Sequence, residues 1–146
     1  SRRSLLAIAA VVDIALHARP APVAAKALAA RHELPPRHLE TMLQALVKAG
    51  ILKGVRGPRG GYELARERRR ITAGAIVRAA MQANSAENLP PLPRSPLVEN
   101  VVGPAVQTAL DACLATLDSV TVAELCQQAE SLAALAGKDA DADFTI

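Results

Sequence analysis

The chain has 146 residues, which suits one medium-sized domain or a small domain with an oligomerisation arm. It is 51% hydrophobic but has one Tyr, one Phe and no Trp, so aliphatic and alanine-rich packing favours helices. Two cysteines are too few for a disulfide framework or an all-cysteine zinc site. No run of 18 apolar residues lacks a charge, which argues against a transmembrane helix.

The charge is divided unevenly along the chain. Residues 1–78 hold 15 Lys or Arg and 5 Asp or Glu, a net charge of +10. Residues 79–146 hold 2 Lys or Arg and 9 Asp or Glu, a net charge of −7. This split indicates a division of labour, in which the basic half meets a polyanion.

The first expected helix spans residues 4–18 and is apolar almost all round, except at Asp13 and His17. Pro20 and Pro22 end it. We expect a buried scaffold helix whose core side chains are Leu5, Leu6, Ile8, Val11, Val12, Ile14 and Leu16.

The same stretch imitates an export signal, because Arg2 and Arg3 precede an apolar run followed by small residues. Asp13 interrupts that run, however, and no Ala-x-Ala cleavage site directly follows it. The sequence therefore predicts a retained first helix and a cytoplasmic protein, with an exported helical protein as the alternative.

Two further helices and a hairpin follow. Residues 23–34 have helical spacing, and Pro35-Pro36 begins a third helix that Gly50 is well placed to end. That third helix has one apolar face, formed by Leu39, Met42, Leu43 and Leu46. ILKGV and YELA are short strands around a Gly/Pro loop, and Thr72 caps a helix over residues 73–81.

The acidic half begins after a proline-rich segment. Residues 82–96 contain four prolines and are expected to form a loop or linker. A helix is placed at 104–118, with a shorter lead-in from 97, and Pro104 either starts or kinks it. The last helix begins near Thr121, where Thr121 and Glu124 form a capping box. The expected units are a domain over 1–81, a linker over 82–96, a helical region over 97–136 and a frayed acidic tail over 137–146.

This order of elements predicts a mainly α, winged helix-turn-helix fold with a two-stranded β-wing. The second helix of such a pair fits a DNA major groove, and its polar side chains reach base edges. An arginine can fork onto guanine, a glutamine can pair with adenine, and a glutamate can accept from cytosine. The candidate base-reading residues are Arg37, His38, Glu40, Thr41 and Gln44.

The wing loop RGPRGGY is the second candidate DNA contact. Glycine lets a backbone approach DNA closely, and an arginine at the tip suits a narrow minor groove. The alternative, a nucleotide-phosphate loop, needs Lys-Ser/Thr after the glycines, whereas Tyr62-Glu63 follows here. The candidate wing contacts are Arg56, Arg59, Gly60, Gly61 and Tyr62, and the candidate phosphate contacts are Arg2, Arg3, Lys53, Arg66 and Arg69.

The stretch HLETMLQALVKAGILKGVRGPRGGYELARERRRITAGAIVRA resembles the signature of the bacterial winged-helix regulators grouped with the iron–sulfur cluster regulator, the Rrf2 family. The shared elements include Leu39-Glu40, the stretch from Ala49 to Leu52, Gly60-Gly61-Tyr62 and Ile71-Thr72. The resemblance covers about residues 4–135 and is most specific in RGPxGGY. It implies a homodimeric transcription factor with its third helix in the major groove and its wing in the minor groove.

The chain also departs from the family pattern. Glu40 stands where the family has a glutamate implicated in DNA-sequence discrimination, but His38 replaces a common aromatic and Ala75 a frequent acidic residue. Cluster-binding members carry three cysteines in the loop that corresponds to 82–96, and this loop has none. Because thiolates ligate iron–sulfur clusters, we expect no cluster.

The expected dimerisation stripe lies on the helix over 104–118. Val106, Leu110, Cys113 and Leu117 follow a 4-3-4 spacing, which suits packing on another helix, within the protomer or across a dimer. Cys113 and Cys126 flank the following turn and could form a redox pair, although buried free cysteines are common core residues. No metal site is expected from the three histidines.

The sequence therefore predicts a homodimeric, sequence-specific DNA-binding regulator that acts as a repressor and is not an enzyme. Its expected partners are double-stranded DNA, a second copy of the chain, and a small-molecule or protein effector, with no membrane. A winged-helix module that binds proteins is the alternative.

Overall fold

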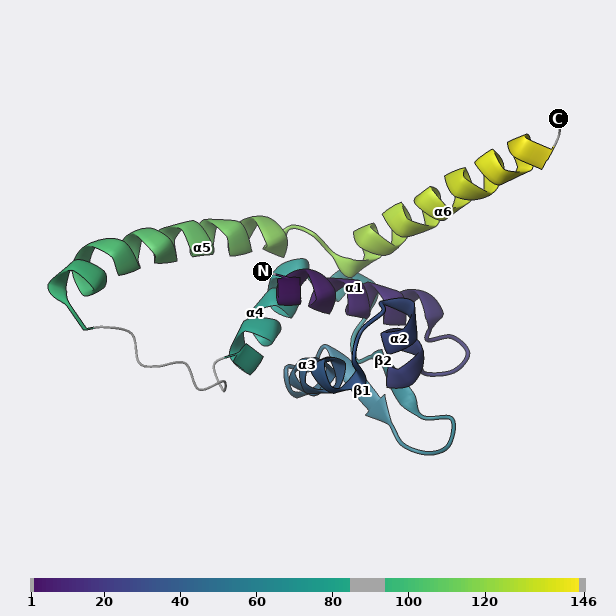
Figure 1. Ribbon diagram of the computed structural model, residues 1–146, viewed down its shortest axis with the longest axis horizontal. Helices are drawn as coiled ribbons and strands as arrows, with labels where there is room; N and C mark the ends of the chain where they lie inside the picture. Colours follow the sequence, from purple (N-terminus) through teal and green to yellow (C-terminus); the bar gives the residue numbers. More distant parts are fainter. Residues whose placement is uncertain (1, 85–93, 145–146) are drawn as a thin grey trace.

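The computed structural model describes the backbone of residues 2–84 and 94–144, and their side chains except those of 84 and 138–144. The chain folds into a helical body with a small wing, from which two long helices extend (Figure 1). The predicted mainly α, winged helix-turn-helix fold is confirmed. The elements in order are α1 (Arg2–His17), α2 (Ala25–Arg31), α3 (Pro36–Lys48), β1 (Leu52–Val55), β2 (Gly61–Leu64), the 3-10 helix η1 (Arg68–Arg70), α4 (Ala73–Asn84), the π-helix η2 (Val98–Val102), α5 (Gly103–Asp118) and α6 (Val122–Phe144).

Several element boundaries differ from the prediction. Helix α2 begins at Ala25, because Val23 forms a β-bridge with Tyr62 instead of a helical turn. Helix α4 runs on to Asn84 into the expected linker, of which residues 85–93 lie outside the described residues. Helix α6 continues to Phe144 through the segment expected to fray.

The hydrophobic core surrounds α1, which packs against α2, α4, β2 and α6. Val11 and Ile14 are fully buried, as predicted, but Leu5 is 70% exposed and the prediction for it is wrong. Much of the close packing is made instead by small side chains, since Ala7 and Ala10 are fully buried. The same core takes in Leu39, Leu43 and Leu46 of α3, and Val122 and Cys126 from the first turns of α6.

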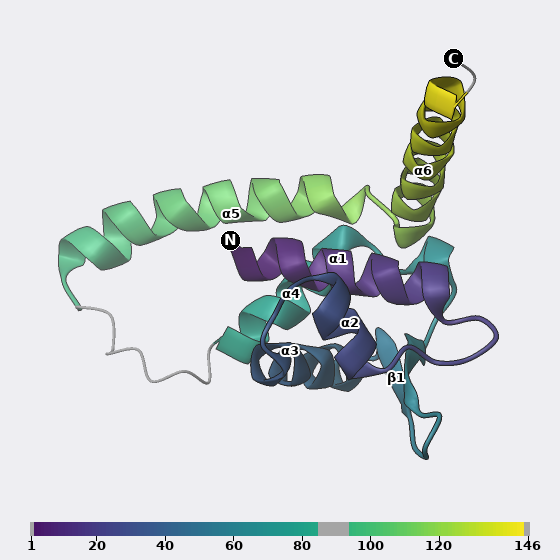
Figure 2. The ribbon, with the colours of Figure 1, turned by 45° about the vertical axis from the view of Figure 1, so that its right-hand side comes forward.

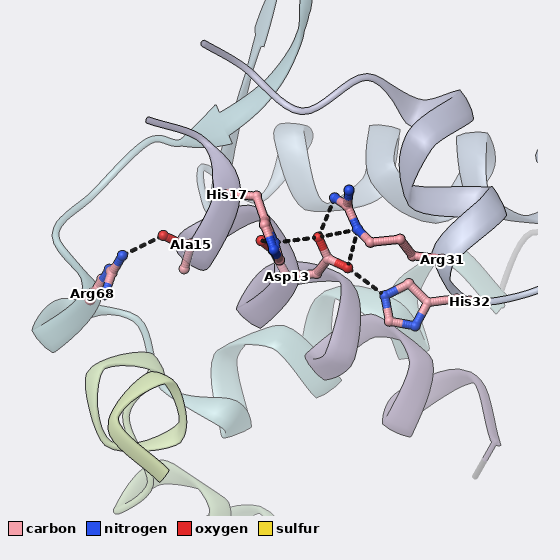
Figure 3. A network of polar contacts seen from close by, with 6 residues as sticks. All are labelled: Asp13, Ala15, His17, Arg31, His32 and Arg68. Atoms are coloured by element: carbon pink, nitrogen blue, oxygen red, sulfur yellow. Dashed lines mark hydrogen bonds and ion pairs between the residues drawn. The ribbon is translucent and has the colours of Figure 1, made fainter. Parts of the chain in front are cut away.

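A buried carboxylate ties α1 to the end of α2 (Figure 3). The side chain of Asp13 is only 9% exposed, and Arg31 donates to it from Nε to Oδ2 at 2.9 Å and from Nη2 to Oδ1 at 2.5 Å. His32 places Nε2 at 2.9 Å from Oδ2, and His17 places Nδ1 at 3.1 Å from Oδ1. Asp13, which interrupts the apolar pattern of the sequence, thus fixes the position of α2 by its charge.

The balance of forces on Asp13 favours its ionised form. Burial by itself raises the pKa of this carboxyl. The hydrogen bonds from Arg31 and His32, and the charges of Arg31 and His17, outweigh burial and hold the pKa below its ordinary value of 3.8. Asp13 is therefore a buried, negatively charged side chain at neutral pH.

Helices α4 and α6 start from a shared pair of short bridging segments. Thr72 and Thr121 form an antiparallel bridge, in which the backbone N–H of Ala73 donates to Val120 and that of Val122 donates to Ile71. The predicted caps are confirmed: Thr72 Oγ1 accepts from the N–H of residue 75 at 3.1 Å, and Thr121 and Glu124 form a reciprocal capping box.

The middle of α4 also holds the end of α5. Arg78 donates to both carboxylate oxygens of Asp118, at 2.6 and 2.8 Å, and these hydrogen bonds hold the pKa of Asp118 below its usual range. From that junction α5 runs back above the body while α6 projects away from it (Figures 1 and 2). The two helices therefore diverge and do not form an antiparallel hairpin.

Candidate nucleic-acid interface

Helix α3 presents a polar face away from the body. Pro36 stands in its first turn and Gly50, with a φ of +75°, follows its end, as predicted. Four apolar side chains on one face are buried, namely Leu39, Met42, Leu43 and Leu46. The opposite face carries the five candidate base-reading residues, which are all exposed: Arg37, His38, Glu40, Thr41 and Gln44.

These polar side chains are hardly used within the protomer. The hydroxyl of Thr41 donates to the carbonyl of Arg37 at 3.5 Å. Within the described part of the chain, the side chains of His38, Glu40 and Gln44 form no hydrogen bond or ion pair. A row of exposed, unpaired donors and acceptors on one helix face can therefore meet an external partner without breaking internal bonds.

The wing is a hairpin of β1 and β2 in which Leu52 faces Leu64 and Val55 faces Gly61. Its loop turns at Gly57, where φ is +117°, and the N–H of Gly60 donates to the Gly57 carbonyl at 2.9 Å. The side chains of Arg56 and Arg59 are exposed. In both views the wing loop and α3 lie on the side of the body opposite to α5 and α6 (Figures 1 and 2).

The remaining wing candidates have a folding role that the sequence did not reveal. A Cβ at Gly60 would lie 2.2 Å from the Val55 carbonyl oxygen, and one at Gly61 would lie 2.3 Å from that of Val23. Tyr62 exchanges two backbone hydrogen bonds with Val23, at 2.8 and 2.9 Å, and packs its ring against the core. These three residues join the wing to the segment before α2, and a contact between them and DNA stays a prediction.

The candidate phosphate contacts are scattered over the body. Lys53 lies across the hairpin from Glu63, with Nζ 3.5 Å from the carboxylate, and Arg66 donates from Nε to the Gly50 carbonyl at 3.1 Å. Arg69 lies in η1, which packs against α6. Arg2 and Arg3 are exposed at the start of α1, away from the wing in both views. Of this set only Lys53 shares the hairpin with the wing arginines.

The expected dimerisation stripe is only partly exposed. Val106 is 61% exposed and Cys113 is exposed, whereas Leu110 and Leu117 are half-buried. The sequence reasoning did not include other exposed apolar side chains in the stripe, because it followed the spacing within 104–118 and gave no direction to the last helix. They are Leu97 just before η2, Val101 and Val102 in η2, and Leu132 and Leu135 on α6.

The two cysteines do not form a pair. Cys113 is free and exposed on α5, while Cys126 is free and buried on α6, and the two helices diverge. Burial raises the pKa of the Cys126 thiol, which disfavours the reactive thiolate. Among the residues with described side chains, no group of three or more His, Cys, Asp or Glu is arranged to hold a metal ion. None of the described helices has both the length and the apolar character needed to cross a membrane.

Comparisons with known proteins agree with this geometry. Residues 1–128 match the model of the Rrf2 family, described as an iron-dependent transcriptional regulator. A protein of Synechocystis sp., whose name describes an HTH-type transcriptional regulator, is 35% identical over 93% of this chain and 92% of its own length. The IscR regulator of Vibrio atlanticus is 35% identical over 55% of this chain, but the match spans only 46% of that protein.

Solved structures show the same fold. IscR of T. potens superposes with a TM-score of 0.68 at 32% identity, covering 90% of this chain and 88% of its own. CymR, the global cysteine regulator of B. subtilis, superposes with a TM-score of 0.64 at 26% identity, covering 88% of this chain and 95% of its own. Sequence, fold and the exposed polar face of α3 therefore agree that this chain is a DNA-binding transcriptional regulator of the Rrf2 family.

Proposed function

We propose that the chain is a cytoplasmic, homodimeric repressor that binds a specific DNA sequence through α3 and the wing. The observation that supports this most is the placement of α3 and the wing loop, both of which carry exposed polar side chains. Helix α3, which carries the five exposed polar side chains, and the wing loop, which carries the exposed Arg56 and Arg59, lie on the same side of the body (Figures 1 and 2). A helix of this kind fits the major groove, and an arginine-bearing loop beside it fits the adjacent minor groove.

A second copy of the chain is the proposed partner of the exposed apolar side chains on η2, α5 and α6. Val101 and Val106 are about equally exposed, at 59% and 61%, and Leu132 and Leu135 are 70% and 60% exposed. Large apolar side chains that stay exposed on two long helices outside the body support an interface between subunits. In a symmetric dimer, two copies of α3 would read two half-sites about one helical turn apart.

The dimer is tested by sedimentation of Val106→Asp beside Thr108→Asp. Both residues are exposed on α5, and Thr108 lies two positions further along the helix, on the opposite face. We expect the wild type and Thr108→Asp to sediment as dimers and Val106→Asp as a monomer with an unchanged unfolding midpoint. A monomeric wild type at micromolar concentration, or a fully dimeric Val106→Asp, contradicts the proposed interface.

We further propose that this regulator works without an iron–sulfur cluster. A cluster needs several thiolates that converge on one point. The chain has only Cys113 and Cys126, one exposed and one buried on diverging helices, so this donor set does not fit a cluster. The signal that the protein senses must then reach it by other chemistry.

Selection of bound fragments from a genomic DNA pool tests the DNA-reading proposal. The selected site is then titrated with Gln44→Ala and with Gln127→Ala, which makes the same change at an exposed position on α6. Loss of one bidentate base contact costs about 1–3 kcal/mol of discrimination. We expect Gln44→Ala to lose that much affinity for the selected site and little for random DNA, while Gln127→Ala behaves as wild type. Equal wild-type affinity for selected and random DNA would rule out sequence-specific control.

The direction of regulation is a separate question with its own measurement. Transcription in vitro from a promoter that contains the selected site is compared with and without the protein. A repressor lowers the transcript as the site fills, whereas a rise in transcript would contradict this part of the proposal.

A further inference from the structure

A large cavity lies between α1, the end of the wing and the base of α6, and the DNA-reading surfaces do not include it. Its volume is about 1140 Å³, which exceeds the roughly 300–1,000 Å³ of most small-molecule sites. Ala15 and Ala18 at the end of α1 form one wall, Leu64 of β2 another, and Ala123 of α6 a third. The remaining wall is η1 and the residues just before it.

The charge of this cavity is its distinctive property. Five arginines line it, against two glutamates: Arg19, Arg66, Arg68, Arg69 and Arg70, with Glu63 and Glu67. Even with both glutamates ionised, the lining residues carry a net charge of +3, from five arginines and two glutamates. Guanidinium groups gathered around one cavity repel each other, and an anion placed among them relieves that repulsion.

Two of the arginines are held in place by the protein. Arg68 donates from Nη2 to the carbonyl of Ala15 near the end of α1 (Figure 3), and its Nη1 lies 4.0 Å from Glu130 of α6. Arg66 donates from Nε to the Gly50 carbonyl. These contacts use part of each guanidinium and leave other N–H donors available, since an arginine carries five.

The other three arginines are uncommitted. Arg19, Arg69 and Arg70 are exposed, and their side chains form no hydrogen bond or ion pair with the residues that the structure describes. The planar fork of a guanidinium matches phosphate and carboxylate oxygens, to which it donates two parallel hydrogen bonds. The cavity thus combines two fixed arginines with three that are free to close on an anion.

The position of the cavity argues against a role in holding the DNA backbone. Helix η1 packs against α6, and α6 begins on the side of α1 that is remote from α3 in both views (Figures 1 and 2). DNA that lies along α3 and the wing loop would therefore pass on the other side of α1. The sequence-based expectation that Arg69 holds a DNA phosphate fits this placement poorly.

We propose that this arginine-lined cavity binds a small oligoanion, a molecule with at least two phosphate or carboxylate groups. One anionic group would be held between Arg69 and Arg70 of η1, and another near Arg19 at the end of α1. The bound molecule would join α1 to η1, which follows the wing strand and contacts α6. It would therefore act on the junction between the DNA-reading body and the projecting helix.

Calorimetric titration without DNA tests this proposal. The full chain is titrated in about 0.15 M salt with inorganic triphosphate in one experiment and citrate in another. The cavity variant is Arg69→Gln with Arg70→Gln, and its matched control is Arg56→Gln with Arg59→Gln, which removes two arginines from the wing. All four residues are exposed, so both variants should keep the wild-type unfolding midpoint.

We expect at least one of the two probes to bind more tightly than about 1 mM. The cavity variant should lose roughly tenfold or more of that affinity, and the wing variant less than about threefold. Binding of triphosphate alone identifies a phosphate ligand, and binding of citrate alone a carboxylate ligand. No binding of either probe, or an equal loss in both variants, overturns the proposal.

DNA titrations of the same two variants separate this proposal from the proposed function. The wing variant should lose DNA affinity and the cavity variant should keep it. A cavity variant that loses as much DNA affinity as the wing variant would assign these arginines to the DNA backbone and overturn the oligoanion site, whereas DNA reading itself would stand.

Discussion

Replacement of Asp13 by asparagine isolates the contribution of the buried carboxylate to the helix-turn-helix. Asparagine has nearly the same shape, but it is uncharged, and its amide nitrogen would face donors where one carboxylate oxygen now accepts. The variant therefore weakens the bonds from Arg31 and His32 without opening a cavity. Helix α2 would lose its charged attachment to α1.

The expected loss is set by how exposed the partners are. Breaking a fully buried ion pair costs about 3–5 kcal/mol, because the charge that remains is neither paired nor solvated. Here Asp13 is 9% exposed but Arg31 is 39% and His32 is 26% exposed, so water can solvate the partners that remain. We therefore expect a loss of about 2–3 kcal/mol in the free energy of unfolding, as for hydrogen bonds to a charged group. For a chain of this length that is roughly 5–10 °C in Tm.

Urea unfolding at neutral pH measures this loss. Asp111→Asn is the matched control, because Asp111 is an exposed carboxylate on α5 whose Oδ1 accepts one hydrogen bond, from Gln107 at 2.8 Å. The control should change the free energy of unfolding by less than about 0.5 kcal/mol. If Asp13→Asn is as stable as Asp111→Asn, the charged network does not stabilise the fold.

Wild type and Asp13→Asn also show how the stabilisation by Asp13 changes with pH. The folded-state pKa of Asp13 lies below the ordinary value of 3.8, so its stabilisation is fully present above that value. It is lost as pH falls through the folded-state pKa, when the carboxylate takes up a proton. The difference in stability between wild type and Asp13→Asn should therefore shrink as pH falls below about 3.8. A difference that grows on acidification contradicts this sign.

Three further substitutions, two at glycines and one at an exposed lysine, test other parts of the fold by urea unfolding. Gly61→Ala should cost about 1–3 kcal/mol, because its Cβ would overlap the Val23 carbonyl and break the bridge to the wing; a neutral result would mean that the bridge is not rigid. Gly50→Ala should cost only about 1 kcal/mol of left-handed backbone strain, since nothing lies within 4 Å of its Cβ, and a larger loss would indicate an unseen contact. Lys53→Ala should change stability by less than about 0.5 kcal/mol, because Lys53 is 66% exposed and Glu63 34%; a loss above about 1 kcal/mol would refute this weak surface pair.

The sequence predicts most of the elements because their signals are local. Pro36 marks the start of α3 and Gly50 its end, and the capping box at Thr121 lies within four residues. The candidate reading face of α3 follows from helical spacing alone, since its apolar residues are buried and its polar ones exposed.

The features that sequence reasoning missed depend on residues far apart in the chain. Asp13 looks like a flaw in an apolar helix until Arg31, 18 positions later, is placed beside it. The tight spacing at Gly61 is explained by Val23, which hairpin logic does not include. The contact of η1 with α6 could not be predicted either, because charge alone does not say on which face an arginine lies; a DNA-phosphate contact by Arg69 stays a prediction.

The bridge between Thr72 and Thr121 gives the molecule a mechanical link. Its two backbone hydrogen bonds, at 2.8 and 2.9 Å, join the first residue of each of α4 and α6 to the segment that precedes the other helix, and α4 in turn packs on α3, the candidate recognition helix. Sliding α6 against α4 would break both bonds, at about 0.5–1.5 kcal/mol each. A displacement of the projecting part of α6 relative to α4 would therefore strain this bridge. In the proposed dimer, the angle between α4 and α6 at this bridge would set how far apart the two copies of α3 lie along DNA.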